Sequence, residues 1–206
     1  MESEKDVEIL ELSTPFAGFF RVNRLALRHR RYDGSWSKPL VRETFERGNS
    51  VAVLPYDPVR DTVVLIEQFR AAAYRAGRNP WLIEVIAGMV EAGETPDTVA
   101  RRESHEEAGC RLLGPLHPVG GYFTSPGAAT EWVDVFAARC DSAGLGGLHG
   151  LAAEGEDIKV LVLPFDEAMG LVASGRIQVS PALIALYWLA ARRPELRPAW
   201  LAEAQG

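Results

Sequence analysis

The apolar residues of this chain fall into short runs that predict strands more often than helices. Valine, isoleucine, leucine and aromatic residues dominate six runs between positions 51 and 163. We expect strands at residues 51–56, 62–69, 81–87, 112–123, 132–139 and 158–163. The first two runs are apolar along nearly their whole length, which predicts central strands of a sheet.

The first 47 residues form a separate pattern. We expect three strands there, at residues 7–12, 19–32 and 36–45, with Asp33 and Gly34 in a tight turn between the second and the third. The alternation at residues 24–32 gives no obvious deeply buried face. These strands therefore need a surface to lie on. It is either the rest of the same chain or, as the more specific prediction, a second copy of the chain.

Three segments have the pattern of helices. Residues 165–174 and 181–192 predict two of them, and the second carries an apolar stripe of Leu183, Leu186, Tyr187 and Ala190. The third, at residues 96–108, has Thr95 as a cap and Gly109 as a left-handed stop. Strands on both sides of this helix, followed by terminal helices, predict an α/β (α+β) fold. We expect an α/β/α sandwich with a mixed sheet at residues 48–206, preceded by an antiparallel β-strand arm at residues 1–47.

The charge and cysteine content of the chain limit its partners and its location. The 206 residues carry a net charge of −6, with 47% hydrophobic and 24% charged side chains. We expect one sizeable core, no nucleic-acid binding, no membrane binding and no membrane span. Cys110 and Cys140 are too few for a disulfide framework, and the first ten residues lack an apolar signal core. A cytoplasmic protein in a reducing compartment is expected.

The helix at residues 96–108 concentrates acidic residues on one face. Glu103, Glu106 and Glu107 are separated by steps of three and four, which brings their carboxylates close together. Because like charges repel, such a cluster favours cations, and hard oxygen ligands select Mg²⁺ or Mn²⁺. A second stripe consists of small residues that let the helix lie close to a sheet: Ala100, Ser104 and Ala108.

The spacing around this helix is that of a known motif. Residues 88–110 read GMVEAGETPDTVARRESHEEAGC, with specified positions at Gly88, Glu94, Arg102, Glu103, Glu106, Glu107 and Gly109. A solvated acidic helix face is the simpler explanation of a charge run, but it explains neither the first glycine nor the arginine. The motif resembles the Nudix box, and the chain is similar to the Nudix hydrolase superfamily.

The resemblance extends from Phe16 to about Trp188 and is closest to bacterial ADP-ribose pyrophosphatases. The stretches that carry it include VVLIEQFRAAAY, PWLIEVIAGMVEAGE, TSPGAATE and HGLAAEGEDIKV. The resemblance implies that ADP-ribose and water react to AMP and ribose 5-phosphate. It also implies a homodimer in which the N-terminal strands are exchanged or shared.

The resemblance further implies a set of metal ligands. Two or more Mg²⁺ ions, with Mn²⁺ as an alternative, would be held by the backbone oxygen of Ala87 and by the carboxylates of Glu103, Glu107 and Glu156. Glu106 lies between two of these residues and is expected to be an additional ligand or an outer-shell partner.

The catalytic base is assigned by the same resemblance. Glu154 corresponds to the proton acceptor, and it lies in a glycine-rich stretch at residues 142–157 that we expect to act as a lid. Glu156 or a box glutamate is the alternative base, and a merely solvated loop is the alternative to a lid. Arg102 is expected to fix a glutamate or the loop rather than to touch the substrate.

Substrate contacts are transferred residue by residue. Arg70 corresponds to an arginine that reaches the phosphates, which suits its planar fork. The residues expected beside the adenosine part are Phe19, Phe20, Arg42, Glu43 and Arg47. The rest of the pocket is expected from Met89, Ser125, Pro126, Gly127 and Glu131. Since adjacent residues of a strand face opposite ways, one of the two phenylalanines should belong to the core.

Other functions remain open from the sequence. Another nucleotide sugar, such as GDP-mannose, would use the same metals. A catalytically silent protein that senses ADP-ribose would keep the pocket, but we would then expect broken box glutamates or an attached DNA-binding segment, and the chain has neither.

Overall fold

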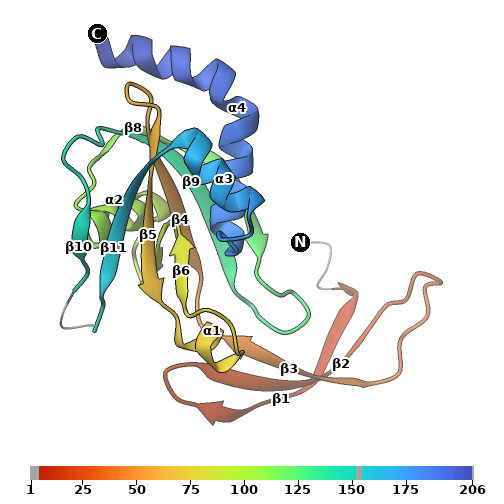
Figure 1. The fold of residues 1–206 in the computed structure, drawn as a ribbon. Coiled ribbons are helices and arrows are strands. Elements are labelled where there is room, and N and C mark those ends of the chain that lie inside the picture. Colours follow the sequence, from red (N-terminus) through yellow and green to blue (C-terminus); the bar gives the residue numbers. More distant parts are fainter. Residues whose placement is uncertain (1–4, 152–154, 206) are drawn as a thin grey trace. The chain divides into compact units, whose positions relative to one another are not determined.

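The computed structural model describes residues 5–151 and 155–205, and its elements are drawn in Figure 1. The chain divides into two compact units. The smaller unit contains residues 1–49 and 122–132, and the larger unit contains residues 50–121 and 133–206. Residues 122–132 therefore cluster with the N-terminal strands, although they follow the box in the sequence.

The smaller unit is built on three antiparallel strands in the order β1-β2-β3. They are β1 (Val7–Ala17), β2 (Arg21–His29) and β3 (Leu40–Glu46). Nearly every residue of β1 is exposed, and none in these three strands is fully buried. The absence of a deeply buried face, predicted from the alternation, is confirmed.

The connection between β2 and β3 is longer than predicted. Gly34 adopts φ +82° in a turn with Asp33, a conformation that suits glycine. The sequence predicts the third strand from residue 36, but it begins at Leu40. Trp36 forms only an isolated bridge to Arg30, whose guanidinium group lies 4.4 Å from the centre of the indole ring. Backbone hydrogen bonds on both sides of this bridge, from Arg31 to Ser35 and from Ser37 to His29, also hold the segment.

The larger unit contains the mixed sheet that the sequence predicts. Its strand order is β10-β11-β5-β4-β9-β8, with β4 parallel to β9 and antiparallel to β5. The strands are β4 (Ser50–Asp57), β5 (Thr62–Phe69), β8 (Leu112–Phe123), β9 (Trp132–Cys140), β10 (Gly147–His149) and β11 (Ile158–Pro164). Of these strands, only β10 is not predicted, because this short edge strand lies in the glycine-rich stretch and has no apolar run.

The apolar run at residues 81–87 forms two strands instead of the one predicted. β6 (Trp81–Glu84) pairs with β5, and β7 (Ile86–Met89) pairs with β4. Direct pairing of β4 with β5 is confined to the residues beside their connecting turn. The chain therefore changes partner at Val85, and the prediction of a single strand is wrong.

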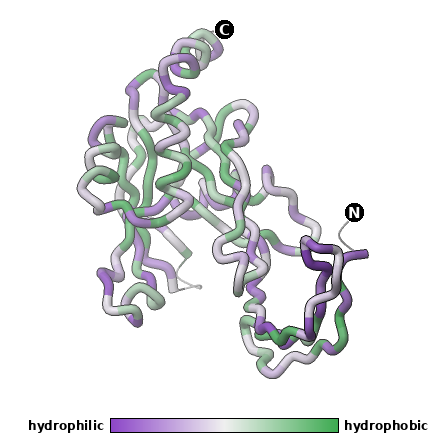
Figure 2. The backbone as a smooth tube through the Cα atoms, turned by 90° about the vertical axis from the view of Figure 1, so that its right-hand side faces the viewer, coloured by the Kyte–Doolittle hydropathy of each residue, from purple (hydrophilic) through white to green (hydrophobic). Residues whose placement is uncertain are grey.

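Helices cover both faces of this sheet. Val99 and Ala108 of α2 (Pro96–Ala108) share a buried cluster with Val53 of β4. On the other face, Trp200 of α4 (Ser180–Gln205) lies 6.0 Å from Tyr56 between ring centres, and strand alternation places Tyr56 opposite Val53. α3 (Phe165–Ala173) packs on β5 and β11. The α/β/α sandwich is thus confirmed, and Figure 2 shows hydrophobic residues concentrated in the central strands of the larger unit.

Two helices depart from the prediction. The short α1 (Ala71–Arg75) was not predicted, and α4 continues well beyond residue 192 although Pro194 and Pro198 lie inside it. Each proline removes a backbone donor, but Arg193 pairs with Asp61 and anchors this half of the helix. In the part of the chain that the structure describes, no helix is long and apolar enough to cross a membrane.

Candidate active site

The box helix begins and ends where the sequence signals place it. Oγ1 of Thr95 accepts a hydrogen bond from the backbone N–H of Thr98, whose hydroxyl completes the capping box. At the other end, Gly109 adopts the left-handed conformation with φ 60°. The small-residue stripe is buried as predicted: Ala100, Ser104 and Ala108. These signals fix the direction in which the carboxylates of α2 project.

Gly88 and Glu103 pack directly on each other. A Cβ atom at Gly88 would lie 1.9 Å from Oε1 and 2.4 Å from Cγ of Glu103. Only glycine leaves room for this side chain, which explains the first glycine of the box physically. Because Ala87 and Met89 flank Gly88 on β7, the carboxylate of Glu103 lies close to the backbone of this strand.

Arg102 connects three carboxylates of the box. Its Nε and Nη2 atoms donate to Glu94 at 3.1 and 3.3 Å, and its Nη1 atom donates to Glu103 at 2.8 Å and to Glu106 at 3.0 Å. The hydrogen bonds with Glu94, and after them the charge of Glu103 and the hydrogen bond with Glu106, raise the pKa of Arg102 against the effect of burial. All three guanidinium nitrogens are therefore directed at box glutamates.

Glu107 is the most deeply buried carboxylate of the box. It is 3% exposed, and its Oε2 atom accepts a hydrogen bond from the backbone N–H of Ala87 at 3.1 Å. Burial raises the pKa of Glu107 to about 8 despite this bond, and the charges of Glu103 and Glu156 act in the same direction. A positive charge beside Glu107 would oppose both effects.

Arg70 is held by a carboxylate that the sequence analysis missed. Its Nε and Nη2 atoms donate to the two oxygens of Glu84 at 2.8 and 3.0 Å. Burial alone would lower the pKa of Arg70, but Glu84, and then Glu107 and Glu156, raise it. The available signal was a glutamate within an apolar strand, since a buried carboxylate needs a cationic or donor partner.

Glu156 lies just before β11 and faces the same group of charges. Its Oε2 atom accepts a hydrogen bond from the backbone N–H of Leu151 at 3.1 Å. The pKa of Glu103 is raised first by burial, against the influence of Arg102, and then by Glu106 and Glu156. Glu154, the expected base, lies outside the described residues.

The expected metal ligands thus lie in one region of the larger unit. Within residues 5–151 and 155–205, no group of three or more acidic, histidine or cysteine side chains is arranged to hold a metal ion, and Glu103 is turned toward Arg102. The donors are all oxygen atoms, and the buried Glu107 is next to like charges. This chemistry fits a hard divalent cation.

Phe19 and Phe20 lie in a bend between β1 and β2, not on the strand that the sequence predicts. The bend is closed by a hydrogen bond from the N–H of Gly18 to the backbone oxygen of Phe20. Phe20 packs on Phe45 with 5.0 Å between ring centres, whereas Phe19 is 86% exposed. Phe20 is thus packed on a second strand, whereas Phe19 contacts only the edge of Phe20, at 4.8 Å between ring centres, and is otherwise exposed. Strand alternation is not the cause of this difference.

The smaller unit also brings two expected ligand contacts together. Nη1 of Arg47 lies 3.3 Å from Oε1 of Glu131, a carboxylate that is 6% exposed. Arg42 and Glu43 are exposed on β3 and are not part of this pair.

The stretch that begins at Ser125 forms a compact turn. The backbone oxygen of Ser125 accepts hydrogen bonds from the N–H groups of Ala128 and Ala129 at 2.9 and 2.7 Å. Pro126 and Gly127 lie inside this turn. A Cβ at Gly127 would meet nothing within 4 Å, so the backbone is open on that side.

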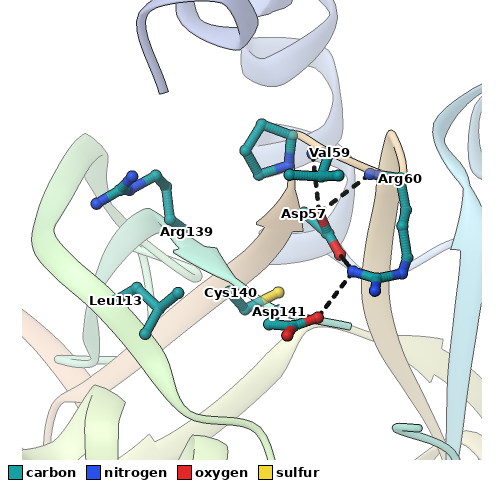
Figure 3. Close-up of a pocket in the computed structure, with 8 residues that line it drawn as sticks. Asp57, Val59, Arg60, Leu113, Arg139, Cys140 and Asp141 are labelled. Carbon is teal, nitrogen blue, oxygen red and sulfur yellow. Dashed lines mark hydrogen bonds and ion pairs between the residues drawn. The ribbon is translucent and has the colours of Figure 1, made fainter. Parts of the chain in front are cut away.

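A separate cavity of about 330 Å³ lies at the far end of β4 (Figure 3). Arg60 bridges Asp57 and Asp141 at its edge, at 2.8 and 2.7 Å. Ala52, near the start of β4, is the residue paired with Ala87, whereas Asp57 ends the strand. The cavity is therefore separated from the box by most of the length of β4, and none of its lining residues was predicted as a site residue.

The mixed sheet, the capped acidic helix and the glycine beneath Glu103 define the class of protein. A family model described as NUDIX domain matches residues 46–183, and the chain belongs to this family. The resemblance identified from the motif spacing is confirmed.

The chain is also similar to curated proteins over nearly its full length. It is 43% identical over 197 residues to an ADP-ribose pyrophosphatase of Escherichia coli (strain K12), with 96% of this chain and 94% of the relative covered. It is 42% identical over 201 residues to an ADP-ribose pyrophosphatase of Haemophilus influenzae, with 96% and 92% covered. A GDP-mannose pyrophosphatase of Cronobacter sakazakii is 35% identical over 189 residues, with 91% and 96% covered.

Proposed function

We propose that this protein hydrolyses the diphosphate of ADP-ribose to AMP and ribose 5-phosphate. The observation that carries the proposal is the buried carboxylate of Glu107, which accepts a hydrogen bond from the N–H of Ala87 and lies close enough to Glu103 and Glu156 for their charges to raise its pKa. The assignment of ADP-ribose as the substrate rests on relatives of more than 40% identity that are named ADP-ribose pyrophosphatase, such as those of Escherichia coli and Haemophilus influenzae. The GDP-mannose pyrophosphatase is the more distant relative.

The reaction depends on divalent cations, for which Mg²⁺ is the proposed ion and Mn²⁺ the alternative, with two or more ions at each site. The residues that would hold them are Ala87, through its backbone oxygen, and Glu103, Glu107 and Glu156. When bound, such ions neutralise the diphosphate and orient the attacking water. Arg102 donates hydrogen bonds to Glu103 and Glu106 and so orients their carboxylates.

Proton transfer and phosphate binding are assigned to residues of the larger unit. Arg70, fixed by Glu84 on its Nε and Nη2 atoms, keeps its Nη1 edge for phosphate oxygens. Glu154 takes the proton of the attacking water. Glu154→Gln should lower kcat by about 10²-fold or more with little change in KM. Near-normal turnover of this variant would move the base to Glu156 or to the box.

We assign the adenosine and ribose parts of the substrate to residues that, apart from Met89, belong to the smaller unit. The proposed contacts are Phe19, Phe20, Arg42, Glu43, Arg47, Met89, Ser125, Pro126, Gly127 and Glu131. The free face of the exposed Phe19 ring suits stacking on a base. The buried carboxylate of Glu131 suits ribose hydroxyls, with Arg47 as its counter-charge.

We further propose a homodimer formed through the N-terminal strands. β1 exposes a row of large apolar side chains that a soluble monomer would leave in water: Val7, Ile9, Leu10, Leu12 and Phe16. A Leu12→Glu, Phe16→Glu double variant should run as a monomer in light scattering after size exclusion. The control is Val59→Glu, since Val59 is similarly exposed but lies in the larger unit. A dimeric double variant would refute this surface.

The substrate proposal is tested by initial rates on ADP-ribose, GDP-mannose, ADP-glucose and FAD with Mg²⁺. ADP-ribose should have the highest kcat/KM. A higher value for GDP-mannose would favour the second candidate, which the 35% identical relative supports. No hydrolysis of any of them would favour the catalytically silent sensor, although all box glutamates are present.

The cytoplasm is the proposed location. Cys110 and Cys140 are both free and buried, which suits a reducing compartment. Neither nucleic acid nor a membrane is a proposed partner, because the net charge of −6 gives no general attraction to anionic surfaces.

A further inference from the structure

Gln68 is a buried polar residue whose side-chain nitrogen, Nε2, has no hydrogen-bond partner. Its side chain is 7% exposed. In the part of the chain that the structure describes, two buried side-chain nitrogens have no hydrogen-bond partner: Nε of Arg47 and Nε2 of Gln68. Arg47 is anchored through its Nη1 atom to Glu131, so Gln68 is the clearer exception. A buried amide donor without an acceptor costs free energy and therefore calls for an explanation.

The strand register places Gln68 on the face of the sheet that carries the box helix. Gln68 lies opposite Ile158 of β11. Ile158 and Ile66 belong to the same buried cluster as Val99 of α2, and side chains directly opposite each other in a ladder share a face. Gln68, two positions after Ile66, therefore faces α2 as well.

Gln68 lies two residues before Arg70, which forms an ion pair with Glu84. The backbone of Arg70 remains extended, with φ −121° and ψ 107°. Glu84 lies opposite Ile66 in the ladder of β5 with β6, on the same side. The amide of Gln68 thus lies between a buried isoleucine and the arginine proposed to hold phosphate.

The carboxylates on this side already have donors. Both oxygens of Glu84 accept from Arg70, and backbone N–H groups donate to one oxygen each of Glu107 and Glu156. None of these carboxylates accepts a hydrogen bond from Nε2 of Gln68, so this donor remains available to an acceptor that enters the site. A diphosphate brings several anionic oxygens, and a hydrogen bond to a charged oxygen is about twice as strong as a neutral one.

We propose that Gln68 is a further substrate-binding residue, whose side-chain amide donates to an oxygen of the diphosphate beside Arg70. An uncharged donor holds this oxygen without adding a second positive charge that would compete with Arg70 for Glu84. The terminal torsion of glutamine is soft, so Nε2 can turn toward the ligand without a change of backbone. The inference rests on the proposed hydrolysis of a nucleoside diphosphate derivative.

The test compares Gln68→Met, which keeps the side-chain size but has no donor, with the wild type. Gln178→Met is the matched control, since Gln178 is exposed and its amide donates to the backbone oxygen of Gly175. For each protein, kcat and KM for ADP-ribose, the Mg²⁺ concentration at half-maximal rate and the midpoint of thermal unfolding are measured.

Gln68→Met should lower kcat/KM about tenfold or more, mainly through KM, while the control keeps the wild-type value. The unfolding midpoint should stay the same or rise, because an unpartnered buried donor is removed. A structural role would instead lower the midpoint together with kcat/KM, and would overturn the inference.

Other outcomes separate this inference from the proposed function. An unchanged kcat/KM in Gln68→Met, with an active wild type, overturns the inference and leaves the function standing. A higher Mg²⁺ requirement at unchanged KM also overturns it, because Gln68 would then orient a carboxylate instead of the substrate. A wild type that leaves ADP-ribose intact overturns the proposed function, and the inference with it.

Discussion

Glu107 accepts a hydrogen bond from the backbone N–H of Ala87 at 3.1 Å, which joins the last turns of the box helix to the strand that precedes the box. The bond fixes a carboxylate that is 3% exposed beside the backbone oxygen expected to bind metal. The hydrogen bond thus fixes α2 and β7 relative to each other. Substitutions in either element should therefore change the rate of catalysis.

Gly88→Ala should inactivate the protein more than it destabilises it. The new Cβ would lie 2.4 Å or less from three atoms of Glu103, so the whole carboxylate has to move. We expect kcat/KM to fall by about 10²-fold with a higher Mg²⁺ requirement. Gly170→Ala is the control, because a Cβ there meets nothing within 4 Å in α3. Wild-type kinetics in Gly88→Ala would show that the position of Glu103 does not matter.

Arg102→Lys should weaken catalysis although it keeps the charge. A lysine cannot reproduce the planar fork that binds Glu94, Glu103 and Glu106 at the same time. We expect kcat/KM to fall about tenfold or more, measured at saturating Mg²⁺. Arg101→Lys alters an exposed pair with Asp97 and hydrogen bonds to the backbone oxygens of Leu112 and Gly114, none of which involves a box glutamate. Its kcat/KM should stay near the wild-type value. Equal effects of the two variants would contradict a specific role for Arg102.

Asp57 should make the stability of the protein sensitive to acid. Burial alone would raise the pKa of Asp57, but hydrogen bonds from Ser142 and Arg60 outweigh it and lower the pKa to about 2. A carboxyl whose folded pKa lies below the unfolded value near 3.8 stabilises the fold above pH 4 and loses this effect as the pH falls toward 2. The effect amounts to about 2 kcal/mol.

Urea unfolding of wild type and Asp57→Asn between pH 7 and pH 3 measures this contribution. The difference in unfolding free energy between the wild type and Asp57→Asn should shrink as the pH falls below 4. In this range Asp57 of the unfolded chain gains a proton, whereas the asparagine does not titrate. A difference that is constant with pH would assign the loss to packing instead.

Thr95→Ala should loosen the start of the box helix. The variant loses both the acceptor for the N–H of Thr98 and one partner of its hydroxyl, and we expect a loss of about 1 kcal/mol in unfolding free energy. Thr95→Ser keeps the oxygen and should retain most of the stability. If serine and alanine were equally destabilising, the methyl group rather than the cap would be responsible.

The sequence predicted best where local signals decide the structure. Thr95 and Gly109 set the ends of α2, and these signals act within a few residues. The strands at 62–69 and 112–123 have the predicted bounds, since their apolar runs are limited by polar turns. The spacing of the box also predicted that Glu103 and Glu106 lie close together, and both accept hydrogen bonds from Arg102.

Prediction failed where distant partners decide. The break at Val85 depends on the divergence of β4 and β5, and the length of α4 depends on the pairing of Arg193 with Asp61. Neither relationship is visible in a local pattern. Glu84 differs, because a glutamate within an apolar strand is itself a local signal, but only the fold shows that its partner is Arg70.

The central claim is that the carboxylates of α2 enable water to cleave the diphosphate of ADP-ribose. Its most direct test is product analysis after incubation of ADP-ribose, Mg²⁺ and protein in ¹⁸O-labelled water, for the wild type and for Glu107→Gln. We predict AMP and ribose 5-phosphate, one of them carrying a single ¹⁸O in its phosphate, and a rate about 10²-fold or more lower for the variant. Intact ADP-ribose with the wild type, or an unchanged rate for Glu107→Gln, would contradict the account.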